Sequence, residues 1–218
     1  LAVVDRDGRF AGLIPPDRLL AVLLIEHDED TSRHGGYLKA TSIAIQASEE
    51  PLRRRFLHRM PWLLLGLGAA LLAADIVGWF EVRLQQQLIF AFFIPSIVYL
   101  ADAVGTQTET LVVRGMSVGV PMARIVRNEI YTGVAVGASL ALAAYPLILW
   151  RWNNADAALV VALAILAASS IATVVAMALP WLLDHFDLDP AFGSGPLATV
   201  IQDLLSIIIY FALVVALT

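Results

Sequence analysis

Five long apolar segments, all after residue 60, restrict this chain to a membrane protein. They cover residues 61–80, 88–115, 128–150, 157–183 and 196–217. A transmembrane helix needs about 20 mostly apolar residues, and each segment has roughly that many or more. Only 15% of the residues are charged, whereas a soluble domain carries about 25%. We therefore predict an all-α membrane protein with five transmembrane helices per subunit. Its partner is the lipid bilayer and not nucleic acid.

The arginines that flank these segments predict the orientation in the membrane. The larger group lies before the first segment or between the second and third, namely Arg53, Arg54, Arg55, Arg59, Arg114, Arg124 and Arg127. Only Arg83 and Arg151 lie on the opposite side. Since loops rich in Lys and Arg stay in the cytoplasm, the N-terminus is expected to be cytoplasmic. An odd number of spans then places the C-terminus outside.

The region before the first segment has the pattern of a small α/β unit. Apolar runs at residues 1–4 and 10–14 flank the turn signal Asp5-Arg-Asp-Gly8, and a helix is expected over residues 18–26. Such a unit is too small to bury its own core. We expect it to be the end of a larger domain, with Leu1 a cut end of something longer. The start of the chain lacks the charged region and short apolar core of a signal peptide.

The chain is thus divided into three parts. Residues 1–30 are the fragment of the α/β domain, and residues 31–60 are a cytoplasmic linker or connecting helix. Residues 61–218 form the transmembrane pore domain.

Polar side chains recur at helical spacing in two of the apolar segments. The second segment carries Asp102, Thr106, Glu109 and Thr110, and the fifth carries Thr199, Asp203, Ser206 and Tyr210. Either set falls on one face of a helix. A carboxylate at the centre of a transmembrane helix costs about 2.5–3.5 kcal/mol, so a retained one indicates a function. Carboxylates and hydroxyls are hard ligands that suit Mg²⁺, Ca²⁺ or Mn²⁺, and we predict a hydrated cation path between the two helices.

Purely structural roles are the alternative for these and other polar residues. The second helix could end near Leu100, which would leave residues 102–114 as a loop, and Asp203 could serve only structural pairing. Asp75 is expected to be interfacial or structural. The acidic stretch at residues 184–189 is either a solvated connector or the mouth of the path.

The cysteine and histidine content limits the possible metal sites, and the small residues indicate how the helices pack. The chain has no Cys, which rules out disulfides and thiolate metal sites. The histidines at positions 27, 34, 58 and 185 show no metal-ligand spacing. Small residues at four-residue intervals predict close helix packing, and these are Gly133, Gly137 and Ala141 in the third segment and Ala164, Ala168, Ala172 and Ala176 in the fourth.

Two stretches in the second and fifth segments have the character of motifs. The first is Gly105-Thr-Gln-Thr-Glu-Thr-Leu-Val-Val-Arg-Gly115. The second is Asp189-Pro-Ala-Phe-Gly-Ser-Gly-Pro-Leu-Ala-Thr-Val-Ile-Gln-Asp203, which continues to Ile209-Tyr-Phe211. The first resembles the second-span motif of the MgtE family of magnesium channels, and the second resembles the entry into that family's fifth helix. The fragment before the membrane resembles the tail of a CBS domain, which precedes the membrane part in MgtE. The resemblance covers nearly the whole chain.

The resemblance implies roles for named residues. Asp203 matches the pore carboxylate that holds hydrated Mg²⁺, Thr106 and Thr110 match an Asn and a Thr that line the pore, and Gln107 matches the family's Gln. It further implies a homodimer whose second and fifth spans enclose the path. The acidic run from Glu26 to Asp30 resembles a region that supplies regulatory Mg²⁺ ligands. The full set of candidate cation ligands is Asp203, Thr106, Thr110, Glu109, Asp102, Gln107 and Thr199.

Three departures from the family pattern leave other functions open. Thr106 replaces an Asn, and Glu109 and Asp102 add carboxylates where the family has small or uncharged residues. The added charge is more similar to the family's eukaryotic relatives, which are Na⁺-coupled Mg²⁺ exchangers. Two further hypotheses are an intramembrane aspartyl protease that uses Asp102 and Asp203, and a regulatory subunit that carries no ion. We predict a channel or transporter and not an enzyme.

Overall fold

The protein is described by a computed structural model that covers residues 2–5, 7–16, 18–20, 51–189 and 194–218. Near the N-terminus, β1 (Ala2–Val4) pairs in antiparallel fashion with β2 (Phe10–Leu13). Gly8 has a φ of 75° in the turn between them, a conformation that glycine adopts without a steric penalty. The two apolar runs around the turn signal are therefore the strands of a hairpin. The helix expected over residues 18–26 is seen only at its start, since residues 21–26 and the acidic run they open lie outside the described residues.

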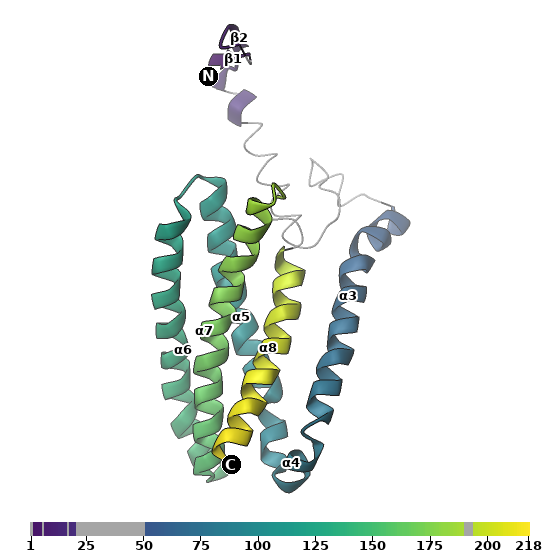
Figure 1. Ribbon diagram of the computed structural model, residues 1–218, viewed down its shortest axis with the longest axis vertical. Coiled ribbons are helices and arrows are strands. Elements are labelled where there is room, and N and C mark those ends of the chain that lie inside the picture. The colour runs from purple at the N-terminus through teal and green to yellow at the C-terminus, as the bar shows by residue number, and fades with distance from the viewer. Residues whose placement is uncertain (1, 6, 17, 21–50, 190–193) are drawn as a thin grey trace.

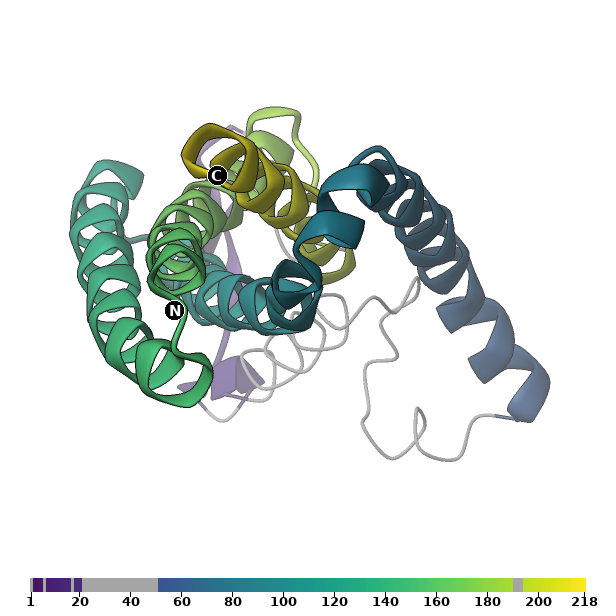
Figure 2. The same cartoon turned by 90° about the horizontal axis from the view of Figure 1, so that it is seen from below.

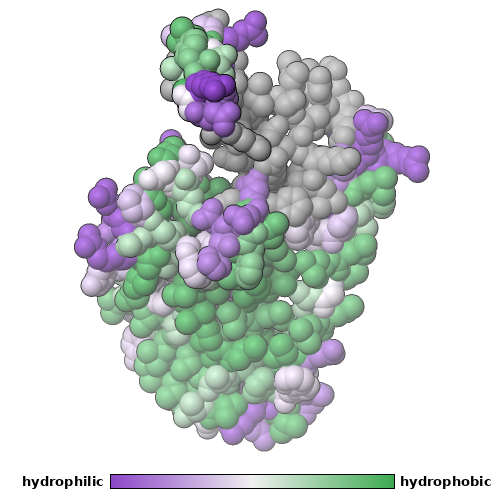
Figure 3. Space-filling view, turned by 45° about the horizontal axis from the view of Figure 1, so that its top comes forward, coloured by the Kyte–Doolittle hydropathy of each residue, from purple (hydrophilic) through white to green (hydrophobic). Residues whose placement is uncertain are grey.

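Within the part of the chain that the structure describes, five helices long and apolar enough to cross a membrane follow the hairpin, as predicted. The order of elements from residue 52 onward is α3 (Leu52–Gly78), α4 (Glu81–Gln86), the 3₁₀ helix η1 (Leu88–Phe93), α5 (Ile94–Ser117), α6 (Met122–Trp152), α7 (Ala155–His185) and α8 (Ser194–Leu217). The long helices run side by side along one axis (Figure 1). On the face shown in Figure 3, apolar side chains cover most of the bundle, and hydrophilic residues gather toward its two ends.

The helices extend beyond the apolar segments that predict them. The first begins at Leu52 and includes the arginine-rich run, and the third begins at Met122, directly after Pro121. Proline before a helix suits its start because its φ is already helical. The interpretation of residues 102–114 as a loop is wrong, because α5 is helical through Ser117. One of its threonines, Thr110, donates a hydrogen bond of 2.8 Å to the carbonyl of Thr106, which satisfies the hydroxyl within the helix.

The core lies where α7 packs against α5, α6 and α8. Small residues of α7, among them Ala164, Ala168 and Ala172, are buried there. On its other side α7 meets α6, and a Cβ at Gly133 would overlap the side chain of Thr173. Gly137 is similarly close to the carbonyl oxygen of Leu166. The small residues therefore serve close helix packing, as predicted from their spacing.

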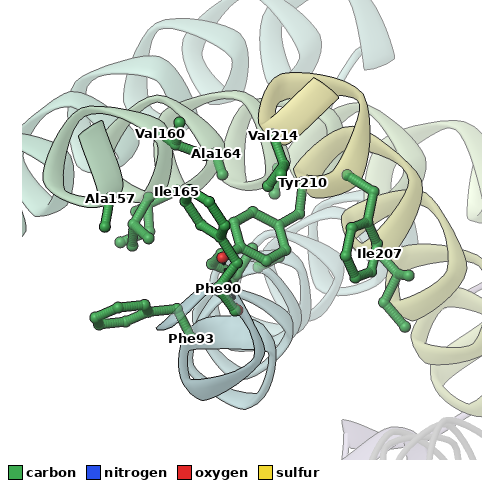
Figure 4. Packing of buried hydrophobic residues seen from close by; sticks show 14 of the residues in the cluster. Phe90, Phe93, Ala157, Val160, Ala164, Ile165, Ile207, Tyr210 and Val214 are labelled. Carbon is green, nitrogen blue, oxygen red and sulfur yellow. Dashed lines mark hydrogen bonds between the residues drawn. The ribbon is translucent and has the colours of Figure 1, made fainter. Parts of the chain in front are cut away.

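An aromatic cluster ties η1 to α8 near the C-terminal end of that helix. The hydroxyl of Tyr210 donates a hydrogen bond of 2.7 Å to the backbone carbonyl of Phe90. Both side chains are 1% exposed, and they pack among Ile207, Val214 and residues of α7 (Figure 4). This bond satisfies the tyrosine hydroxyl, which has no water to bond in the interior of a membrane bundle, and it fixes η1 against α8.

Helix α3 stands to one side of the other four long helices (Figures 1 and 2). It packs mainly against α8. Within α3, which the structure describes completely, Ile76 alone is buried. Several of its leucines are more than half exposed, namely Leu63, Leu64, Leu67 and Leu71. One side of α3 is thus free to face lipid or another subunit.

The bond between Tyr210 and Phe90 gives a first testable prediction. Tyr210→Phe removes the donor and with it the buried hydrogen bond between α8 and η1, which is expected to destabilise the fold by about 0.5–1.5 kcal/mol. The thermal unfolding midpoint of the detergent-solubilised protein should fall by several degrees. Tyr99→Phe, at a position that is 68% exposed, is the matched control and should leave the midpoint unchanged. An equal midpoint in the two variants would contradict this role.

Candidate cation-binding site

A cavity of about 710 Å³ lies between α3, α5 and α8. Small residues of α3, such as Gly66 and Ala70, form one wall and leave room beside the helix. The polar side chains that line the cavity come from the other two helices, and they are Thr106, Glu109, Thr199 and Asp203. None of the described residues that line it is basic. The cavity therefore combines an apolar wall with oxygen ligands and a negative charge.

Asp102 sits close to the two carboxylates of this cavity. It is near enough to Glu109 and to Asp203 for the charges to repel one another. Its own carboxylate accepts a hydrogen bond of 2.9 Å from the hydroxyl of Thr199. This bond joins α5 to α8 across the edge of the cavity. Three acidic side chains thus lie in one region between two helices.

A second polar contact joins the same helices nearer the start of α8. Glu109 is 1% exposed and shares a side-chain hydrogen bond with Ser194, the first residue of α8. Since α5 and α8 run in opposite directions, the pairs 102–199 and 109–194 follow one another along a single interface. Two residues of the polar stripe of α5, Asp102 and Glu109, therefore hold α8 in place by hydrogen bonds.

The remaining candidate residues lie elsewhere. Thr110 and Gln107 are exposed on α5 and do not line the cavity. Ser206 and Tyr210 of the predicted α8 stripe are buried on the side of that helix that faces the core, while Asp203 and Ile207 face the cavity. The α8 stripe is thus divided between two environments.

Gln202 is a residue that the sequence analysis overlooked. Its side chain is 2% exposed, and neither its amide oxygen nor its amide nitrogen has a hydrogen-bond partner among the described residues. The amide lies against Gly105, and a Cβ at that glycine would overlap it. An amide in an apolar run, one position before an acidic residue, was the available signal.

Other polar residues are not part of this site. Asp75 is exposed on α3 and does not line the cavity. In the acidic stretch at 184–189, Asp184 and His185 belong to the last turn of α7, and the His185 ring stacks on Trp181 at 5.8 Å. His27 and His34 lie outside the described residues.

The arrangement favours an ion that keeps its water shell. Among the residues that the structure describes, no three His, Cys, Asp or Glu side chains converge closely enough to hold a metal ion directly. The cavity volume is many times the roughly 30 Å³ that one water molecule occupies in the liquid. Mg²⁺ dehydrates reluctantly and often binds through one or two carboxylates and several waters. A hydrated divalent cation fits both the volume and the ligands.

Comparison with known proteins identifies relatives of this chain. The family model MgtE, described as a divalent cation transporter, matches residues 94–213. The chain is 31% identical over 221 residues to the magnesium transporter MgtE of Bacillus subtilis, with 99% of this chain and 48% of the relative covered. The MgtE proteins of Enterococcus faecalis and Thermus thermophilus are 29% and 27% identical, over 96% and 97% of this chain and 46% and 47% of their own lengths. The chain spans about half the length of these curated relatives.

The matches bear on the sequence-based predictions. The resemblance stated from the two motifs is confirmed, and so is the prediction of a multi-pass membrane protein. The matched family is one of transporters, which agrees with the prediction that the chain is not an enzyme and leaves the aspartyl protease hypothesis without support.

Proposed function

Because this chain belongs to the MgtE family of divalent cation transporters, we propose that it carries Mg²⁺ across the membrane along the cavity between α3, α5 and α8. One observation supports this path above others. The only charged groups among the described lining residues are the carboxylates of Glu109 and Asp203, which lie between membrane-spanning helices. Carboxylates in such a place are costly unless they serve an ion.

The chemistry of the lining suggests how the ion is held. Asp203 and Glu109 attract the divalent charge, and the hydroxyls of Thr106 and Thr199 accept or donate hydrogen bonds to its water shell. Asp102 adds negative charge from the edge of the cavity. Thr110 and Gln107, which lie outside this cavity, are proposed to line the path where a second subunit meets α5.

The same proposal includes assembly and orientation. A homodimer would bring two copies of α5 and α8 together around the path. The N-terminus is proposed to be cytoplasmic and the C-terminus external. A regulatory Mg²⁺ site in the acidic run Glu26 to Asp30, within a CBS-like fragment at residues 1–30, stays a prediction because that run lies outside the described residues.

A coupled exchanger is the second candidate, and the count of carboxylates favours it. Asp102, Glu109 and Asp203 together carry three negative charges when ionised, one more than a single Mg²⁺ balances. A second monovalent cation would balance the remainder, and a buried unbalanced charge is unfavourable. The channel and the exchanger therefore differ in their dependence on Na⁺.

The function is tested by Mg²⁺ entry into liposomes that contain the purified protein and a Mg²⁺-sensitive dye. We expect rapid entry down a Mg²⁺ gradient, unchanged when an outward Na⁺ gradient is imposed. Empty liposomes are the control. Entry that needs opposing Na⁺ would select the exchanger. No entry above the control under either gradient would contradict transport and favour a regulatory subunit.

A further inference from the structure

Gln202 is buried in the α5–α8 interface with its polar end unused. Its side chain is 2% exposed, and its amide oxygen and nitrogen both lack a hydrogen-bond partner among the described residues. Buried polar groups in proteins are nearly always paired, because an unpaired one loses its bonds to water without replacement. Between membrane helices, where no bulk water is available, this loss is more severe. An unpaired amide in this position therefore calls for a function.

The position of the amide follows from its contact with Gly105. A Cβ on that glycine would overlap the amide oxygen, carbon and nitrogen of Gln202. The amide thus occupies the space where a side chain at position 105 would begin. Gly105 is buried, and only a residue without a side chain leaves this space open. The glycine and the glutamine are complementary in size.

Helix geometry places this amide between two carboxylates. Asp102 lies three positions before Gly105 and Glu109 lies four positions after it, so all three share one face of α5. Cβ atoms at such spacings are about 5–6 Å apart. Each neighbouring carboxylate is tied to α8 by one hydrogen bond, Asp102 to Thr199 and Glu109 to Ser194. The Gln202 amide lies in the interval between these two contacts.

An amide can bond both to a carboxylate and to a cation, which suits a position between Asp102 and Glu109. It offers two N–H donors to a carboxylate and one oxygen to a cation, and it carries no charge of its own. A lysine here would repel the cation, and a leucine would leave both carboxylates without a polar neighbour on this side. The next residue, Asp203, lines the cavity. The amide itself lies behind this lining, on the buried side of α8.

We propose that Gln202 sets the cation affinity of the site, and that its amide takes the place of water beside Asp102 and Glu109. The inference rests on the proposed function and names a residue that determines how tightly that site holds its ion. Both polar atoms of the amide are unpaired among the described residues, so its N–H groups are available to the carboxylates and its oxygen to the ion or the ion's water shell. A residue that only fills space would not set the affinity for a cation.

Variants of Gln202 separate the two roles. Gln202→Met keeps length and apolar volume but removes the amide, and we expect at least a tenfold rise in the Mg²⁺ concentration for half-maximal entry into liposomes. Gln202→Glu keeps the shape and adds a charge, so half-saturation should move in the opposite direction and maximal flux should fall because release is slower. Gln86→Met, at an exposed position outside the bundle core, is the matched control and should match wild type.

A double variant that moves volume from position 202 to position 105 separates the chemical role of the amide from its packing role. In the double variant Gly105→Ala with Gln202→Ala, the added methyl group takes the space that the amide vacates, and the unfolding midpoint should stay near that of wild type. The Mg²⁺ half-saturation should still rise at least tenfold. If the double variant transports with wild-type half-saturation, Gln202 only fills space and the proposal is overturned.

Binding of Mn²⁺, followed by electron paramagnetic resonance on the solubilised protein, tests the site without transport. Weaker Mn²⁺ binding in Gln202→Met and tighter binding in Gln202→Glu would support the proposal even if no flux were found, in which case only the transport function would fail. Flux that is present in wild type, together with Mn²⁺ affinity that is equal in all variants, would overturn the role of Gln202 alone. Absence of both flux and Mn²⁺ binding in wild type would overturn both.

Discussion

Asp203→Ala is expected to lower Mg²⁺ entry into liposomes by at least about 100-fold, which corresponds to about 2.7 kcal/mol. Asp203 is one of only two charged residues among the described lining of the cavity. A carboxylate and a divalent ion separated by one water layer, roughly 5 Å, attract by about 7 kcal/mol at an effective dielectric constant of about 20. Part of this attraction is replaced by Asp102 and Glu109, so the expected loss is smaller than the full value.

The matched control for this variant is Asp75→Ala. Asp75 also lies in a membrane-spanning helix, but it is exposed on α3 and does not line the cavity. Its replacement should leave the initial rate of Mg²⁺ entry within about twofold of wild type, or about 0.4 kcal/mol. Asp203→Asn keeps the shape and removes the charge, and it should behave like Asp203→Ala. Entry at the wild-type rate in either Asp203 variant would remove this residue from the path.

The largest effect on folding is expected for Gly133→Leu. A Cβ at this position already overlaps the side chain of Thr173, and α6 and α7 pack closely along this face. Even modest overpacking costs about 1–3 kcal/mol, and a branched side chain adds three more carbon atoms to the overlap. We expect little monodisperse protein after solubilisation, measured by size-exclusion chromatography, and a midpoint at least 10 °C lower in what remains.

A glycine without neighbours is the control for this effect. Gly68 of α3 is exposed, and a Cβ there would meet no atom within 4 Å. Gly68→Leu should therefore give normal yield and a normal unfolding midpoint. The pair Gly133→Ala with Thr173→Gly moves the methyl group across the interface and should recover much of the stability. Normal yield in Gly133→Leu would mean that α6 and α7 do not pack as described.

The number of spans could be predicted because hydropathy is an additive property of the sequence. Each apolar segment longer than about 20 residues corresponds to a helix that can cross a membrane. The exact ends could not be predicted from this property, because helices continue into polar residues. The run from Leu52 to Arg59 is helical although it is rich in arginine, and Met122–Asn128 is helical although it is partly charged.

The sequence could predict which polar residues belong to the candidate site, but it could not predict which helix each of them faces. Helical spacing places Thr199, Asp203, Ser206 and Tyr210 within one broad sector, yet α8 is packed on two sides. Asp203 faces the cavity, while Tyr210 is turned into the core toward η1. The spacing of residues gives the angle around a helix, and it does not say which helix lies at that angle.

Gln202 illustrates the same limit more sharply. In the sequence it is an uncharged residue beside an aspartate, and nothing marks it as buried. Its environment depends on Gly105, which lies almost one hundred positions earlier in the chain. Gly105 belongs to the motif of α5, and only the packing of α8 against it shows that the Gln202 amide fills the space of its missing side chain.

Because α3 is packed sparsely, the wall of the cavity that it forms can tilt. Two walls, α5 and α8, are joined by the bond between Thr199 and Asp102, whereas α3 is held in the core chiefly at Ile76. From Ile76 to Trp62, the lining residue of α3 farthest from that pivot, the helix measures about 21 Å at 1.5 Å per residue. A tilt of about 8° around the pivot would move Trp62 by about 3 Å, the diameter of a water molecule. Small rotations of α3 can therefore set the width available to a hydrated ion while the carboxylate frame stays fixed.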